Sequence, residues 1–285
     1  MPISNTMAPQ FHLLTTPRYD KQLLQARELP GGYAGWNFYQ ESPIYMWDYH
    51  HKRLLKGAKY FGWKDAVQAL ETHLDVDRFA KEIDSFVGPC PETPLRLRIL
   101  LSPEGSVHME KYDISATGLE NLFPQSFHQA SGPAPSETER GPKTTPMYTL
   151  VVDRERTKSS VHTRFKTTLR DVYDAARQRA QLTPAENVEV LLVNEDNGHV
   201  MEGSITTPYF FRGGRWVTPP VPRELSDVEG SGGQDGVSRR WALDCGLAVE
   251  EPVSAESLVD GEACWISNGA RGFMCATVKL TDAQS

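Results

Sequence analysis

The chain has 285 residues, with 30 Lys and Arg against 37 Asp and Glu, and a formal net charge of −7 at pH 7. This length allows two domains and a substantial core. The mildly acidic balance, without a basic block or basic face, argues against nucleic acid or an anionic membrane as a partner, so a small-molecule ligand is expected.

Targeting segments and metal-binding motifs are not evident. Residues 1–20 lack a basic segment followed by an apolar one, and no run of about 18 apolar residues occurs, so we expect a soluble protein of the cytoplasm. The cysteines form no Cys-x-x-Cys pair and do not cluster with histidines. Reduced, packed thiols are expected, with neither a disulfide nor a metal site.

The first part of the chain, residues 1–115, predicts a small α+β domain. Apolar spacing predicts a strand, a long helix, one or two further helices and two strands joined by the turn Pro103-Glu104-Gly105. In chain order these elements are expected over residues 11–20, 45–63, 64–88, 94–102 and 106–115.

Residues 116–146 are rich in Pro, Ser, Thr and Gly without apolar periodicity, which is typical of a linker. Residues 147–285 predict a larger, strand-rich domain. A strand is expected over 147–153 and a helix over 167–180, followed by strands over 188–194, 199–205, 209–212 and 215–220 and a helix over 237–246. Residues 250–280 predict a strand, a short helix and two further strands. Asp196-Asn197-Gly198 predicts a tight turn, because Asn and Gly tolerate positive φ.

Two residues of the larger domain are candidates for chemistry. Lys166 lies between a short β-prone run and the predicted start of a helix, where lysines are mostly solvated. Glu202 shares one face of a strand with Val200 and Ser204, in a run suited to the interior. A buried carboxylate is costly unless it is paired, although a surface position remains the common alternative.

Three further stretches could bind a phosphate. At Gly236-Val237-Ser238 a glycine-rich loop enters a helix, whose free N–H groups can hold an anion. The small-residue loop at 267–272 follows an apolar strand. Arg53 carries a guanidinium that can bind phosphate in a bidentate manner, although such arginines are commonly solvated on a helix face. Each signal is weak alone.

Taken together, these residues indicate one ligand. Pyridoxal 5′-phosphate (PLP) requires a lysine that can form an imine, a carboxylate that pairs with a protonated pyridine nitrogen, and an arginine with helix N-terminal amides for its phosphate. The combination is far more specific than any member of it.

The larger domain resembles the class IV aminotransferases, the fold-type IV PLP enzymes that include branched-chain and D-amino-acid aminotransferases and aminodeoxychorismate lyase. The resemblance lies in the order of Lys166, EGS at 202–204, GGRWVTPP at 213–220, GVSRR at 236–240 and SNGARG at 267–272. The first domain resembles the family's small domain in LLTTPRYD and HHKRL. The resemblance implies a two-domain α+β fold and a homodimer.

The resemblance also implies roles for individual residues. Lys166 would form the Schiff base and move protons, Glu202 would pair with the pyridine nitrogen, and Arg53 would hold the phosphate. The cofactor-binding residues implied in this way are Arg53, Lys166, Glu202, Val237, Ser238, Gly269 and Ala270. The implied substrate residues are Thr16, Arg18 and Arg98, each of which could instead lie at the surface or in an ion pair. Arg170 is more typical of a structural residue.

The chain departs from the family pattern in two places. Most members have an asparagine after the glutamate, where this chain has Thr207 or has lost the position. Gly269 stands where many relatives carry a hydroxyl residue. The substrate side is therefore less defined by the resemblance than the cofactor side.

Within the family, the closest likeness is to fungal-type aminodeoxychorismate lyases, through LLTTPRYD, FKTTLRDVYDAAR and the long linker. This implies conversion of 4-amino-4-deoxychorismate to 4-aminobenzoate and pyruvate, a step toward folate. A transaminase acting on a D-amino acid, a branched-chain amino acid or a primary amine needs the same lysine and cofactor, so the motifs leave it open. A binding or scaffold protein without chemistry would have no need for Lys166, Glu202 and Arg53 together.

Overall fold

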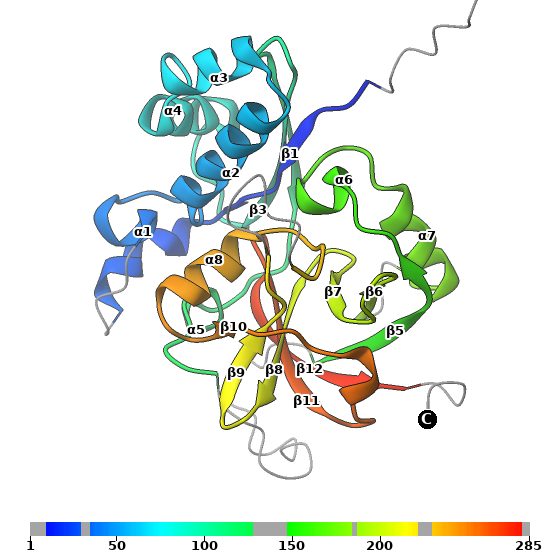
Figure 1. Cartoon of the computed structure of the whole chain (residues 1–285). Helices are drawn as coiled ribbons and strands as arrows, with labels where there is room; N and C mark the ends of the chain where they lie inside the picture. Colours follow the sequence, from blue (N-terminus) through cyan, green and yellow to red (C-terminus); the bar gives the residue numbers. More distant parts are fainter. Residues whose placement is uncertain (1–9, 30–34, 128–146, 184–186, 222–229, 281–285) are drawn as a thin grey trace, which may run out of the picture.

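Two β-sheets organise the chain, and each is built from one part of the sequence. The computed structural model describes residues 10–29, 35–127, 147–183, 187–221 and 230–280. The first sheet has four strands and the second has eight, and helices accompany both (Figure 1). This arrangement confirms the α+β class predicted from the sequence.

The four-stranded sheet is centred on one apolar strand. Its strands are β1 (Leu13–Thr15), β2 (Arg18–Tyr19), β3 (Leu95–Leu101) and β4 (Val107–Asp113). β3 pairs with β4 on one side and with both β1 and β2 on the other, always antiparallel. The single strand predicted over 11–20 is thus divided in two. Pro17 stands at the break and has no N–H with which to continue the ladder.

Helices pack against this sheet and supply most of its core. They are α1 (Trp36–Tyr39), α2 (Trp47–Tyr60), α3 (Lys64–Glu71) and α4 (Val76–Val87). The 3₁₀ helix η1 (Lys21–Glu28) instead buries Leu23 and Ala26 in a cluster with residues of the eight-stranded sheet. In α4, Phe79, Ala80, Ile83 and Val87 are buried, at the spacing of one helix face, and the Asp75 side chain caps the helix by accepting from the N–H of Arg78. In Figure 1, α2, α3 and α4 lie on the side of the molecule that carries β1, away from β8, β9, β11 and β12.

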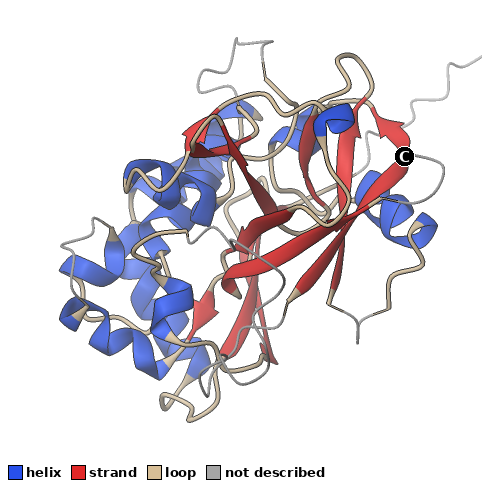
Figure 2. Ribbon diagram, turned by 90° about the horizontal axis from the view of Figure 1, so that it is seen from below, coloured by secondary structure: helices blue, strands red, loops and turns tan. Residues whose placement is uncertain are grey.

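The eight-stranded sheet has the order β10-β9-β8-β11-β12-β5-β6-β7. Its strands are β5 (Tyr148–Thr157), β6 (Val188–Asn194), β7 (Val200–Gly203), β8 (Thr207–Arg212), β9 (Arg215–Thr218), β10 (Val249–Glu250), β11 (Ala263–Asn268) and β12 (Gly272–Lys279). The predicted turn between β6 and β7 is confirmed, since Gly198 has a φ of 70° and its N–H donates to the Asn194 carbonyl. Figure 2 shows the strands crossing the middle of the molecule with most helices to one side.

The remaining helices are α5 (Leu119–Leu122), α6 (Val161–Arg164), α7 (Asp171–Arg179), α8 (Val237–Asp244) and the 3₁₀ helix η2 (Ala255–Ser257). α5 lies inside the predicted linker. Leu122, Phe123 and Phe127 are buried in a core cluster with Trp241 and Phe273, so the first part of that segment is packed structure. Residues 128–146 lie outside the described part, and the domain limits at 115 and 147 stay a prediction.

Candidate functional site

A cavity of about 520 Å³ lies where the two sheets face one another. Its walls come from β3, α2, the segment around Lys166, β7, the start of α8 and the loop between β11 and β12. All the residues that the sequence implied for cofactor binding line it, namely Arg53, Lys166, Glu202, Val237, Ser238, Gly269 and Ala270. The structure therefore brings together residues from distant parts of the chain.

The backbone around Lys166 is extended rather than helical. The helix predicted from Thr167 begins only at Asp171. The Lys166 carbonyl accepts from the N–H of Leu14 at 2.9 Å, and Leu13 and Thr167 form an isolated antiparallel bridge. Backbone groups that pair with β1 cannot also form helical bonds, and this competition explains the later helix start. The lysine is thus held against the four-stranded sheet.

The Lys166 ammonium lies in an environment that favours its neutral form. Burial lowers its pKa well below the usual 10.5, and the nearby Arg170, Arg53 and Arg96 guanidinium groups lower it further. The Glu202 carboxylate has the opposite effect and raises the pKa of Lys166. A neutral amine is the form that can act as a nucleophile or accept a proton, so the site prepares Lys166 for both roles.

Glu202 is only 7% exposed and lies at the sheet edge, on β7. Burial raises its pKa to about 7, against the opposing effects of a hydrogen bond from Tyr173 and of the Lys166 and Arg170 charges. The Tyr173 hydroxyl donates to Glu202 Oε1 at 2.6 Å and accepts from Gln234 Nε2 at 3.1 Å. This chain of hydrogen bonds fixes the carboxyl group at one wall of the cavity.

A second buried carboxylate shapes the turn that follows Glu202. Glu189 is 1% exposed, and its oxygens accept from the hydroxyls of Ser204 at 2.6 Å and Thr206 at 2.9 Å. It also accepts from the backbone N–H of Ser204 and of Ile205. The turn is therefore held by several hydrogen bonds, and the residue that follows it, Thr207, lines the cavity.

One end of the cavity has the features of an anion site. The Arg53 guanidinium donates to Thr15 Oγ1 at 2.7 Å, and this hydroxyl lies 2.6 Å from His50 Nδ1. His50 Nε2 and Arg53 Nε are buried and have no hydrogen-bond partner among the described residues. A Cβ on Gly269 would lie 2.8 Å from both His50 Cε1 and Val237 Cγ2, so only glycine leaves this wall open.

These observations fit a phosphate group. Two orphaned nitrogens are costly in a protein interior unless an acceptor reaches them, and the N-terminus of α8 supplies further N–H donors. Ser238 Oγ lies 2.8 Å from Ser267 Oγ, which in turn lies 2.9 Å from the Tyr209 hydroxyl. The hydroxyl of Ser238 is thus held at the same end of the cavity.

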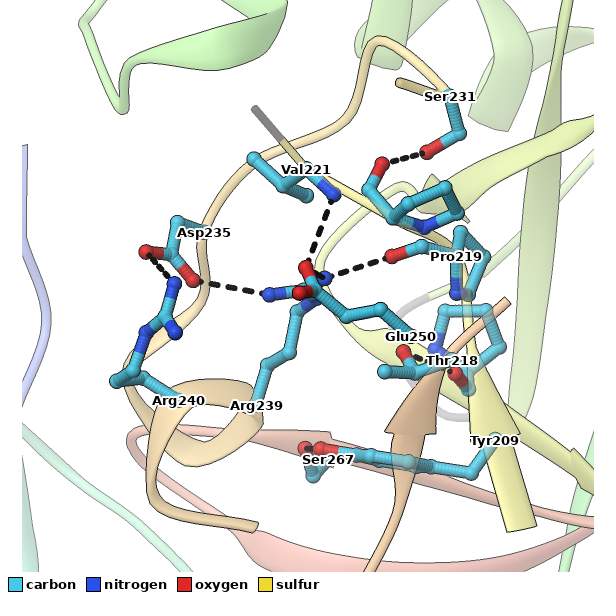
Figure 3. A network of polar contacts seen from close by, with 12 residues as sticks. Tyr209, Thr218, Pro219, Val221, Ser231, Asp235, Arg239, Arg240, Glu250 and Ser267 are labelled. Carbon is cyan, nitrogen blue, oxygen red and sulfur yellow. Dashed lines mark hydrogen bonds and ion pairs between the residues drawn. The ribbon is translucent and has the colours of Figure 1, made fainter. Parts of the chain in front are cut away.

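The position of α8 is set by a buried arginine that does not line the cavity. Arg239 extends between Asp235 at 3.1 Å and Glu250 at 2.5 Å, and it donates to the Pro219 carbonyl at 2.8 Å (Figure 3). The figure shows its guanidinium enclosed between the loop before α8 and strand β10. This network fixes the loop from which the Val237 and Ser238 amides project.

The three predicted substrate residues have different positions. Thr16 and Arg98 line the cavity, and Arg98 forms an ion pair with Glu110 at 2.6 Å. Arg18 does not line it. Arg18 is fully buried, pairs with Asp20 at 2.7 Å and donates to the carbonyls of Ser115 and Ala270. The prediction of Arg18 as a substrate ligand is therefore replaced by a structural role behind the Ala270 loop.

Several residues of the site were missed from the sequence. His50 carried a detectable signal, because it precedes Arg53 by three positions on a helix and so shares its face. Tyr173 and Gln234 carried none, since their contacts depend on tertiary structure. The missed residues that line the cavity or hold its walls are His50, Arg96, Tyr173, Glu189, Gln234, Ser267 and Arg271.

The described residues give two further findings. No group of three or more His, Cys, Asp or Glu side chains is arranged to hold a metal ion in this part of the chain. Within the same residues, every helix is too short or too polar to cross a lipid bilayer.

Comparison with known proteins places these features in context. The sequence profile of the amino-transferase class IV family matches residues 33–277. The aminodeoxychorismate lyase of Saccharomyces cerevisiae is 32% identical over 148 residues, which are 46% of this chain and 37% of the yeast protein. The match thus spans well under half of that relative.

Solved structures share the fold. A protein from Mesorhizobium loti assigned as an amino-acid aminotransferase has a TM-score of 0.62 and 24% identity, covering 94% of this chain and 99% of its own. The 4-amino-4-deoxychorismate lyase of Pseudomonas aeruginosa has a TM-score of 0.55 and 16% identity, covering 94% and 83%. At these identities the likeness concerns the fold, and it confirms the expected fold type.

Proposed function

Because the chain belongs to the class IV aminotransferases, a family of PLP-dependent enzymes, we propose that it binds PLP and acts as a 4-amino-4-deoxychorismate lyase, forming 4-aminobenzoate and pyruvate. The choice of a lyase is supported by the 32% identity to the yeast lyase over the matched segment. The homodimer, the cytoplasmic location and the place in folate synthesis are proposals that follow from the same resemblance.

The observation that carries the proposal is the meeting of Lys166, Glu202 and Arg53 in one cavity with the orphaned His50 Nε2. Arg53, His50, the Ser238 hydroxyl and the amides of Val237 and Ser238 would hold the phosphate. The turn at Gly269 and Ala270 would form a wall beside it, because the Ala270 N–H already donates to Asn268 Oδ1. Glu202 would face the pyridine nitrogen, and Lys166 would provide the amine for the covalent link. When bound, the cofactor supplies an electron sink for the carbon that bears the substrate nitrogen.

The chain's own residues provide the acid and base chemistry. Lys166 Nζ, whose pKa is lowered by burial and by neighbouring arginines, takes the proton from the carbon that bears the substrate nitrogen. The same nitrogen can return a proton to the departing enolpyruvate fragment. Glu202, held by the hydrogen bond from Tyr173, would place a carboxylate beside the pyridine nitrogen and so support its protonated form.

The first prediction concerns Lys166. Purified protein supplied with PLP should absorb in the near-visible, and borohydride should fix the cofactor to the chain at residue 166. Lys166→Ala should abolish both the fixed adduct and the release of pyruvate from enzymatically made 4-amino-4-deoxychorismate, because no other amine occupies that position. Mass spectrometry of the reduced protein and a coupled pyruvate assay measure the two results. Lys158→Ala, in the loop before α6, serves as the matched control.

A different outcome would decide against the lyase. If the protein converted bound PLP rapidly to the pyridoxamine form with simple amino donors and released no pyruvate from aminodeoxychorismate, it would be a transaminase. A protein that stayed colourless with added PLP would exclude both reactions.

A further inference from the structure

Two arginines of β3 face the same cavity but meet different partners across the sheet. Arg96 and Arg98 are two positions apart, so their side chains lie on one face of the strand. On the neighbouring strand β4, Arg98 stands opposite Glu110 and Arg96 stands opposite Tyr112. The register therefore determines which of the two charges is neutralised.

The charge of Arg98 is already compensated by a neighbouring carboxylate. Its guanidinium contacts Glu110 Oε1 at 2.6 Å, and Glu110 also accepts from the Tyr112 hydroxyl at 2.6 Å. The Arg96 guanidinium instead lies over the Tyr112 ring, 4.7 Å from its centre, and forms no ion pair with a described residue. Arg96 is also close enough to lower the pKa of Lys166. An unneutralised cation thus lies within reach of the reacting amine.

A second such cation comes from the opposite wall. Arg271 lies in the turn between β11 and β12, where Asn268 Oδ1 accepts from its backbone N–H at 2.8 Å. Arg271 lines the cavity, and its guanidinium forms no ion pair with a described residue. The turn is fixed, because the same Asn268 oxygen accepts from the Ala270 N–H at 3.0 Å. Arg271 therefore projects from a rigid support.

The cavity as a whole carries more positive charge than a phosphate requires. The basic side chains that line it are Arg53, Arg96, Arg98, Lys166, Arg170 and Arg271, and the acidic ones are Asp113 and Glu202. Arg53 and the α8 amides lie at the phosphate end, and Glu110 compensates Arg98. Arg170 donates to the Ser204 carbonyl at 2.7 Å and lies over the Tyr173 ring, and burial lowers the pKa of Lys166 well below its usual value. Arg96 and Arg271 are therefore the guanidinium groups that remain for another anion.

We propose that Arg96 and Arg271 form a subsite for a ligand with two carboxylates, one bound by each guanidinium. This inference rests on the proposed function and deepens it, because 4-amino-4-deoxychorismate carries two carboxylates. Arg98 is excluded from the primary contacts by its pair with Glu110. A site of this kind disfavours branched-chain amino acids, which have one carboxylate, and primary amines, which have none.

The test uses a ligand that cannot react. Chorismate carries the same two carboxylates but has no amine to engage the cofactor, and shikimate is a related ring with one carboxylate. Calorimetry of the PLP-supplemented full chain should show tighter binding of chorismate than of shikimate. A charge-assisted hydrogen bond lost from a carboxylate typically costs enough to weaken binding about tenfold or more. Arg96→Gln and Arg271→Gln should each weaken chorismate binding by about that factor. The variant that removes the guanidinium not used by the single carboxylate of shikimate should therefore reduce the chorismate-to-shikimate preference.

Control variants separate the subsite from general charge effects. Arg215→Gln removes an equal charge from an arginine that pairs with Glu251 outside the cavity, and it should leave the preference unchanged. Arg96→Lys should recover part of it. In the lyase assay, Arg96→Gln should raise KM for aminodeoxychorismate far more than it lowers kcat, with the PLP absorbance retained.

The failure of this inference differs from the failure of the proposed function. If the wild-type chain binds PLP but does not prefer chorismate, or if both glutamine variants keep the full preference, the two-carboxylate subsite is wrong while the cofactor assignment stands. If the chain binds no PLP yet prefers chorismate in an Arg96-dependent manner, the subsite is supported and the enzyme proposal fails.

Discussion

Glu202 links the cofactor site to the stability of the protein. Burial raises its pKa from 4.5 to about 7, so the folded chain holds a proton that the unfolded chain releases within this interval. The free energy of unfolding of the PLP-free protein should therefore fall as the pH rises from about 4.5 to about 7, by up to ~3 kcal/mol from this residue. Glu202→Gln should remove that loss, and the variant should be more stable than wild type at pH 8.

Denaturant unfolding of PLP-free protein at pH 5 and pH 8 measures the effect. Glu256→Gln, a change at an exposed position, is the control and should follow the wild-type pH dependence. With PLP added, wild type should become more stable than Glu202→Gln at pH 8. The positive charge of the pyridinium would compensate the Glu202 carboxylate, whereas a glutamine carries no charge to pair with it. Parallel pH curves for wild type and Glu202→Gln would contradict this account.

At the scale of residues, the sequence could predict chemistry that depends on identity and order. Lys166, Glu202 and Arg53 are candidates because PLP would need a lysine, a carboxylate and an arginine, and all three line one cavity. Arg18 was predicted to bind substrate for the same reason, since an arginine is a residue type that binds carboxylates. Only the fold shows that its guanidinium is occupied by Asp20 and by two carbonyl groups.

At the scale of elements, the Arg239 network holds the start of α8. Arg239→Lys should destabilise the protein by about 2 kcal/mol, because a single ammonium cannot replace a planar fork that reaches Asp235, Glu250 and the Pro219 carbonyl. The affinity for PLP should fall as well, since the Val237 and Ser238 amides lose their support. Denaturant unfolding and PLP titration measure the two effects.

Arg240→Lys is the neighbouring control. Arg240 contacts only Asp235 among these partners, at 2.7 Å, and a lysine can keep that pair. If Arg240→Lys lost as much stability as Arg239→Lys, the buried Arg239 guanidinium would have no special role.

Element boundaries were predicted well where periodicity alone decides them. The predicted helix at 237–246 and the predicted strands at 188–194 and 106–115 correspond closely to α8, β6 and β4. The helix predicted from Thr167 begins late because β1 pairs with the lysine segment, and a contact between residues so distant in the chain leaves no local pattern. The strand predicted over 11–20 is divided in its middle, at Pro17.

At the scale of the molecule, Arg18 joins the two sheets. It lies on β2, its backbone N–H donates to the Gly269 carbonyl at 3.1 Å, and its guanidinium donates to the Ala270 carbonyl at 3.2 Å. Arg18→Met should cost about 3–5 kcal/mol of unfolding free energy, because it leaves the buried Asp20 carboxylate without its partner. Denaturant unfolding measures this loss.

Arg78→Met provides the comparison. The ion pair of Arg78 with Asp75 is exposed, with side chains 64% and 39% accessible, and its loss should cost no more than about 0.5 kcal/mol. Replacing both Arg18 and Asp20 by apolar residues should recover part of the stability. Equal effects of Arg18→Met and Arg78→Met would contradict a bridging role for Arg18.

The hydrogen bond from Leu14 to the Lys166 carbonyl has a consequence for biosynthesis. The lysine takes its position from a strand near the start of the chain, while the Gly269 and Ala270 wall comes from near its end. No nascent chain shorter than about residue 271 contains every wall of the cavity. Capture of the proposed cofactor would therefore follow the synthesis of residue 271, and the appearance of cofactor colour would time the moment at which the two sheets close.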